Sequence, residues 1–227
     1  MSDPLDHLLA EIRACRLCVE APRGDPLPHA PRPVIRTRSS ARIAVCGQAP
    51  GTRVHASGIP FTDPSGDRLR NWMGVTADEF YDERRIAIVP MGFCFPGLDA
   101  KGSDRPPRRE CAQQWREQVF ELLAHVEVLL VVGQYAQRWH LGEAARGSLT
   151  ETVAAWREIG ALARPGAPMV IPLPHPSWRN TGGIKTHPWF EAELLPHLRD
   201  VVGAVLAARP SAEPFHQSRL PRPAVPL

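Results

Sequence analysis

The stretch from Arg42 to Gly51 reads RIAVCGQAPG and joins an apolar run to a turn rich in Gly and Pro. The run at 42–46 predicts a central β-strand, because short apolar segments with β-branched residues suit a strand buried on both faces. The turn at 47–51 ends that strand. Cys46 lies inside the run, so we interpret it as a buried core thiol and not as a metal ligand.

Short apolar runs and amphipathic segments alternate outward from this stretch. They predict strands at 85–89, 126–132 and 169–173, and helices at 3–15, 67–73, 110–125, 134–141 and 189–207. Such alternation is typical of one α/β domain with a parallel sheet. Ligands of parallel sheets bind beyond the carboxyl ends of the strands, so we expect the loops 47–51, 90–97 and 174–180 to converge on one cleft.

Composition limits the remaining organisation. The chain has 227 residues, of which 43% are hydrophobic, enough for a sizeable core. We predict one domain over 1–208, with an exposed loop at 19–40, and a flexible Pro-rich tail over 209–227. No run approaches the ~20 apolar residues of a membrane span, and no signal peptide is evident, so we expect a cytoplasmic protein without a membrane partner. The net charge of +3 permits a nucleic-acid partner without requiring one.

Four cysteines form a candidate metal site. Cys15 and Cys18 make a C-x-x-C at the end of the first predicted helix, and Cys94 and Cys111 flank a loop rich in Pro and Gly. Two close and two distant cysteines can hold an iron–sulfur cluster or a zinc ion. The cytoplasm keeps thiols reduced, which favours metal ligation over disulfides.

Three short motifs carry a resemblance to a known family. The turn 47–51, the segment Gly58-Ile59-Pro60-Phe61 and the triplet His175-Pro176-Ser177 together resemble the uracil-DNA glycosylase superfamily, over roughly residues 5–205. With the four cysteines, the chain is similar to the iron–sulfur, family-4 branch. The resemblance implies a three-layer α/β/α sandwich around a four-stranded parallel sheet, and a [4Fe–4S] cluster on the cysteines, with zinc as the alternative.

The resemblance also implies an activity. The protein would be a monomer that hydrolyses the N-glycosidic bond of uracil or another deaminated base in DNA, for base excision repair. His175 would stabilise the departing base anion, because a neutral imidazole can donate a hydrogen bond to it. Phe61 would stack on the extruded base. The remaining base- and DNA-binding candidates are Ala49, Pro50, Gly51, Ser177 and Asn180.

Two positions depart from the family pattern. Gln48 stands where family-4 enzymes carry Glu, and an amide can orient the attacking water but cannot accept its proton. Another branch relies on an Asp in a Phe-Thr-x-Asp stretch, so Asp63, one position earlier here, is the candidate carboxylate. The base-reading Asn of family 4 is missing from 89–93, which leaves the preferred base open and makes Asn180 a candidate for polar contacts.

Other interpretations remain open at this stage. The chain could be a nucleic-acid-binding module that kept the fold and lost the chemistry, or a zinc-stapled hydrolase of a small nucleotide. Trp178 could wedge into the DNA stack or serve in packing. His140 is interpreted as a surface or satisfied histidine. Arg105, Arg108 and Arg109 form a small basic patch that suits either solvent or phosphate.

Overall fold

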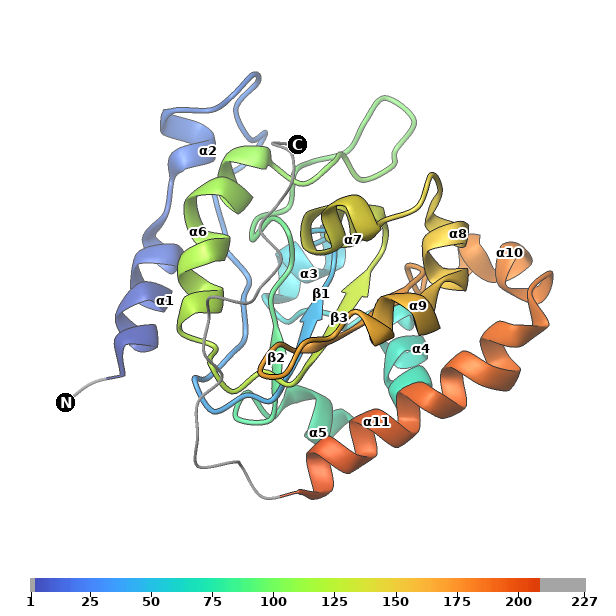
Figure 1. Ribbon diagram of the computed structural model, residues 1–227. Coiled ribbons are helices and arrows are strands. Elements are labelled where there is room, and N and C mark those ends of the chain that lie inside the picture. Colours follow the sequence, from blue (N-terminus) through green and yellow to red (C-terminus); the bar gives the residue numbers. More distant parts are fainter. Residues whose placement is uncertain (1–2, 209–227) are drawn as a thin grey trace.

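A four-stranded, wholly parallel sheet lies at the centre of the structure, a computed structural model that describes residues 3–208 (Figure 1). The order is β2-β1-β3-β4. The bounds are Ile43–Cys46 for β1, Ile86–Ile88 for β2, Val128–Val132 for β3 and Met169–Leu173 for β4. The predicted tail at 209–227 lies outside the described residues.

Alternate side chains of the strands face two separate cores. Ala44 and Cys46 point to the core under α1 (Pro4–Ala14), α6 (Arg109–Glu121) and α7 (Gln134–Leu141). Ile43 and Val45 point to the core under α4 (Pro64–Met73), α5 (Ala77–Tyr81) and α11 (Leu195–Ala207). Because helices cover both faces of the sheet, the three-layer α/β/α sandwich is confirmed, and so is the buried position of Cys46.

Shorter helices complete the fold. They are α2 (Leu17–Glu20), α3 (Thr52–Ser57), α8 (Leu149–Ala154), α9 (Trp156–Ala161) and α10 (Thr181–Lys185), with 3₁₀ turns at Gly142–Ala144 and Trp178–Asn180. Sequence periodicity did not predict these helices, because one or two turns give too few apolar repeats to register.

Two predicted helices begin differently from expectation. The helix predicted at 67–73 begins at Pro64, because Asp63 caps it by accepting the Gly66 N–H at 3.2 Å. The closing helix starts with a π turn, Phe190–Leu194, before α11. Pro196 has no N–H to donate, so the regular i→i−4 pattern is interrupted there.

The segment predicted as an exposed loop at 19–40 is in part wrong. Val34 and Ile35 are buried, and Arg36 forms an antiparallel bridge with Ile88, with N–H···O distances of 3.1 and 2.7 Å. The bridge covers the free edge of β2, which would otherwise present unpaired backbone groups.

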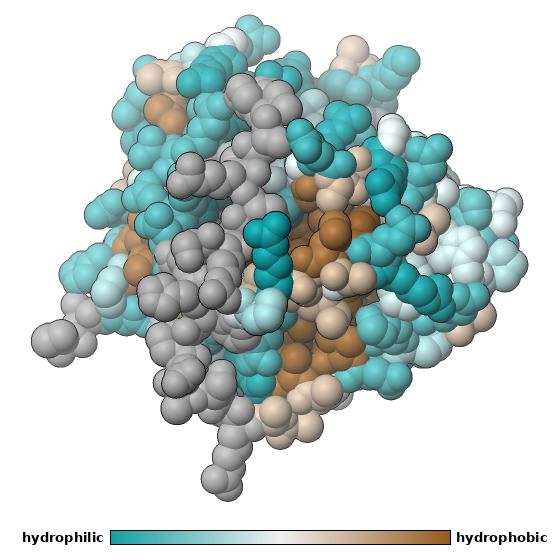
Figure 2. Space-filling model, in the orientation of Figure 1, coloured by the Kyte–Doolittle hydropathy of each residue, from teal (hydrophilic) through white to brown (hydrophobic). Residues whose placement is uncertain are grey.

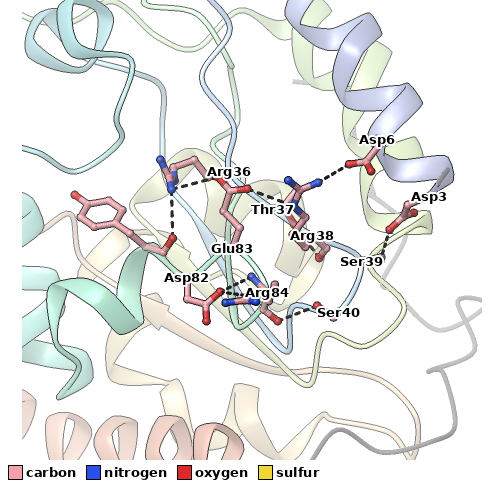
Figure 3. A network of polar contacts seen from close by, with 11 residues as sticks. Asp3, Asp6, Arg36, Thr37, Arg38, Ser39, Ser40, Asp82, Glu83 and Arg84 are labelled. Carbon is pink, nitrogen blue, oxygen red and sulfur yellow. Dashed lines mark hydrogen bonds and ion pairs between the residues drawn. The ribbon is translucent and has the colours of Figure 1, made fainter.

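A polar network fastens the first helix to this segment (Figure 3). Arg38 contacts Asp6 at 2.6 Å, and the Ser39 hydroxyl donates to Asp3 at 2.5 Å. Asp3 also caps α1 by accepting the Leu5 N–H. Exposed ion pairs contribute little singly, but together these contacts hold the start of the helix that ends beside Cys15.

The outer face drawn in Figure 2 is mostly hydrophilic, with hydrophobic residues gathered near its middle. Within residues 3–208, no helix has the length and apolar character needed to cross a membrane.

Candidate functional site

A cavity of about 310 Å³ opens beyond the carboxyl ends of the strands. The turn after β1, the segment 60–65, the loop between Cys94 and Cys111, and His175 after β4 all line it. The expected convergence is therefore confirmed for the whole loop at 47–51 and, through His175 alone, for the loop at 174–180. Of the loop predicted at 90–97, only Pro90 reaches the cavity, and Leu98, Gly102 and Asp104 take the place of the rest.

His175 lines the cavity as a neutral hydrogen-bond donor. The Ser177 backbone N–H donates to Nδ1 of the ring at 3.2 Å, so Nδ1 is the acceptor and Nε2 carries the proton. Burial lowers the pKa of His175, and the nearby carboxylates of Asp63 and Asp104 only partly offset that effect. The amide of Asn180 donates to the His175 carbonyl at 2.7 Å and braces the loop. This combination presents an uncharged Nε2–H donor at neutral pH.

Asp104 is a carboxylate that sequence reasoning missed. It is an exposed residue that lines the cavity, and a Cβ on Gly51 would lie 3.3 Å from its Oδ2, so the carboxylate rests against the turn after β1. Desolvation raises the pKa of Asp104, while the electrostatic interactions with His175 and with the charged Arg179 oppose the rise. An acidic residue inside a loop bracketed by two candidate metal ligands was the signal that could have revealed it.

Asp63 and Gln48, the two other polar residues predicted for the site, also line the cavity, and they differ in their hydrogen bonds. One oxygen of Asp63 is engaged as the cap of α4. Gln48 lies on the turn after β1, and its backbone carbonyl accepts the Gly92 N–H at 3.0 Å. Gln48 and Asp63 thus stay candidates for positioning water. Asp104 differs from Asp63 in that its carboxylate does not cap one of the described helices.

Phe61 is held in a strained conformation that presents its ring to the cavity. Its φ of 57° is left-handed, which is unusual for an aromatic residue. Tyr81 and Arg70 donate to its carbonyl at 3.0 and 3.2 Å. Gly66 makes the turn possible, because a Cβ there would lie 1.8 Å from that carbonyl oxygen. The ring lies against Gly47, where a Cβ would meet Cζ at 3.4 Å, and forms one wall of the cavity.

The remaining predicted residues divide between wall and rim. Ala49, Pro50 and Gly51 line the cavity, while Ser177 and Asn180 stand behind His175 and orient it. Arg68 of α4 donates to the Ser177 carbonyl at 3.1 Å and to the Thr181 hydroxyl at 2.9 Å. These bonds fix the His175 loop to the helix that follows Phe61.

Trp178, on the same loop, is 77% exposed. A large aromatic side chain with so little packing is available to another molecule.

The four predicted ligand cysteines line a second, smaller cavity. Cys15 follows α1, Cys18 lies in α2, and Cys94 and Cys111 come from the loop and from α6. Apolar side chains, among them Ile12, Phe93 and Trp115, complete the lining.

Hydrogen bonds reach three of these sulfurs. The backbone N–H groups of Arg32 and Phe93 donate to Cys94 and Cys111, and the Arg108 side chain bonds Cys18. Burial raises the pKa of Cys94 to about 12. Four thiols around one shielded space, with N–H donors to the sulfurs, fit a thiolate-bound metal group. In the described part of the chain, no three Cys, His, Asp or Glu side chains are gathered tightly enough for a single ion.

Comparison with known protein families bears on the fold and the large cavity. A family model described as the uracil DNA glycosylase superfamily matches residues 35–199. The match includes every residue named above as lining the large cavity, together with Cys94 and Cys111, and leaves Cys15 and Cys18 outside. Since the match covers most of the chain, the protein belongs to the uracil DNA glycosylase superfamily.

Proposed function

We propose that the protein is a DNA glycosylase that hydrolyses the N-glycosidic bond of uracil, or of another deaminated base, in DNA during base excision repair. The observation that carries the proposal is the neutral Nε2–H of His175 in a cavity that also holds an aromatic wall and two carboxylates. Superfamily membership supports a glycosylase-type hydrolase acting on DNA.

Each residue that lines the cavity has its own role in the proposed reaction. The extruded base enters first and stacks on Phe61, and the sugar stays at the mouth. As the C1′–N bond breaks, electrons pass to the base, and His175 Nε2–H stabilises the developing anion. The sugar gains oxocarbenium character. Water then attacks C1′, and its proton passes to Asp104, an exposed carboxylate that lines the cavity beside Gly51.

Asp63 and Gln48 have supporting roles in this proposal. The negative charge of Asp63 favours the oxocarbenium ion, and Gln48 orients the water. In this proposal Asp104 supplies the carboxylate that Gln48 cannot provide.

The DNA strand would cross the rim beside His175. Ser177 and Asn180 lie there, and Arg179 places its guanidinium 3.5 Å from the Ser103 hydroxyl, between the two rim loops. Such polar groups position a phosphate backbone. The exposed Trp178 suits a wedge that holds the gap left by the extruded nucleotide. We propose that the protein works as a monomer in the cytoplasm.

An excision assay tests the activity. Oligonucleotides that carry uracil, hypoxanthine or xanthine are incubated with excess protein, and alkali then cleaves any abasic product. We expect cleavage at one or more of these bases and none at the matched normal base. Specific binding without cleavage would support the binding module instead. Hydrolysis of free nucleotides, insensitive to salt, would support the nucleotide hydrolase, because DNA binding weakens with salt.

Phe61→Ala should weaken binding to uracil-containing DNA by roughly ten- to a hundredfold, since base–aromatic stacking contributes ~1–3 kcal/mol. The measurement is fluorescence anisotropy with a non-cleavable deoxyuridine analogue. Phe61→Tyr keeps a stacking face and is the matched control. Equal affinity of the alanine variant and the parent would show that the ring does not contact the base.

We further propose that Cys15, Cys18, Cys94 and Cys111 hold a [4Fe–4S] cluster, with zinc as the alternative. When bound, the group would act as a structural cross-link between the N-terminal helices and the loop that carries Asp104. The cysteines themselves support this, because they line one cavity from three separate places in the chain.

Cys15→Ala should abolish the visible absorption of protein purified without oxygen, because one of four ligands is lost. Cys46→Ala is the matched control and should keep the colour, since Cys46 is buried in β1. Iron and zinc analysis accompanies the spectra. Stoichiometric zinc without iron would show that the four cysteines bind zinc and not an iron–sulfur cluster.

A further inference from the structure

Arg116 of α6 is the largest fully buried side chain, at 1% exposure. One of its terminal nitrogens, Nη1, donates to the carbonyls of Val89 and Pro90 at 3.2 and 2.7 Å. The other, Nη2, contacts Cys46 Sγ at 3.4 Å and His140 Nε2 at 2.5 Å. All of these partners are neutral groups.

Among the residues that the structure describes, no carboxylate pairs with this charge. None of the ion pairs formed within residues 3–208 includes Arg116, and its buried Nε has no hydrogen-bond partner. His140 cannot share the charge, because burial and the guanidinium both lower its pKa, far below the ordinary value. The Phe120 ring, 5.1 Å from the guanidinium carbon, is a weak substitute for an anion. A buried, uncompensated cation is costly, so its presence calls for a reason.

The position of Arg116 supplies that reason. Its partner Cys46 is the last residue of β1, and Val89 and Pro90 directly follow the end of the adjacent strand β2 at Ile88. Pro90 lines the large cavity, and so do Gly47 and Gln48, whose carbonyls accept the Met91 and Gly92 N–H groups at 2.8 and 3.0 Å. The guanidinium is therefore bonded to the carbonyl of one lining residue, Pro90, and contacts Cys46, which directly precedes the lining residue Gly47.

We propose that Arg116 is a positioning residue that also places a fixed positive charge next to the leaving base, and that this charge favours departure of the base as an anion. The inference rests on the proposed glycosylase activity. In this proposal the base, on which the negative charge develops, lies against Gly47, Gln48 and Pro90 and so next to Arg116, whereas the sugar, on which the positive charge develops, lies farther from it. The field of Arg116 thus favours the charge separation of the transition state, and the low dielectric of its site strengthens that field.

The leaving group provides the test. 5-Fluorouracil is a more acidic base than uracil and needs less help to depart as an anion. Single-turnover excision is measured for both bases with the parent, with Arg116→Met and with Arg116→Gln. Loss of the charge should slow uracil excision roughly tenfold more than 5-fluorouracil excision. The rate for 5-fluorouracil divided by the rate for uracil should therefore rise about tenfold. A role in packing alone would lower both rates by the same factor.

Two variants separate charge from stability. Arg116→Lys keeps the charge and loses the forked hydrogen bonds, so the parent rate ratio should persist even where both rates fall. Arg42→Gln is the matched destabilised control: Arg42 is a buried arginine paired with Glu127 at 2.6 Å at the opposite ends of the strands. Its rate ratio should equal that of the parent.

The outcomes are distinct. An unchanged ratio in the folded neutral variants would overturn the inference and leave the proposed function intact. If neither neutral variant folds, the lysine variant decides, and a tenfold rise in its ratio would overturn the role of the charge. Absence of excision by the unaltered protein would remove the proposed function and this inference with it.

Discussion

Replacing His175 with alanine should lower the single-turnover rate of uracil excision by ~10²–10³-fold, the usual effect of losing one preorganised donor to a developing anion. The structure supplies the preorganisation. The Ser177 N–H fixes the tautomer, Asn180 braces the carbonyl, and burial lowers the pKa of His175 and keeps the ring neutral. The measurement uses excess protein over a uracil oligonucleotide, so that product release does not mask the chemical step.

Two comparisons make the His175 result specific. His175→Gln retains an N–H donor on a flexible side chain and should recover part of the lost rate. His187→Ala removes a histidine outside the cavity, one that packs near Trp189, and should excise uracil at the parent rate. A rate for His175→Ala within threefold of the parent would exclude the imidazole as the main anion stabiliser.

Local patterns in the sequence were enough to predict the sheet. The run 42–46 and the segments 126–132 and 169–173 each became strands, because a strand buried on both faces needs only a short apolar run. His175 and the turn 47–51 then had to meet, since parallel strands end at one edge of the sheet.

The approach of Asp104 to the cavity could not be predicted in the same way. It depends on the path of an irregular loop, which turns at Gly97 with φ of 90° against Pro28 and bridges Leu98 to Asp104. No periodic pattern records such a path. The strain at Phe61 is hidden for the same reason, because the sequence shows an aromatic residue but not the carbonyl contacts that hold it.

Asp104→Asn should reduce uracil excision by ~10²–10³-fold, since a positioned general base commonly contributes about that much. The amide keeps the size of the side chain and can orient water, but it cannot accept the proton. Asp63→Asn should cost less, because Asn can still cap α4 and the change removes a supporting charge but not the proton acceptor. Equal losses for the two variants would return Asp63 to the role that its motif first suggested.

The pH profile distinguishes a proton acceptor from a structural carboxylate. Desolvation raises the pKa of Asp104 above its ordinary value of 3.8, so the carboxylate takes a proton at a higher pH than a solvated Asp would. Excision by the parent should therefore fall as the pH drops through that raised pKa, and rise to a plateau above it.

Asp104→Asn should lose this acidic limb, since the residue that titrates is gone. Asp99→Asn is the matched control in the same loop: Asp99 accepts the Lys101 and Ser103 N–H groups outside the cavity, which Asn can also do, so both rate and profile should match the parent. An acidic limb that persists unchanged in Asp104→Asn would assign the titrating base to another group. A limb lost only in Asp104→Asn would show that the cysteine-bracketed loop supplies the carboxylate that the Gln48 position lacks.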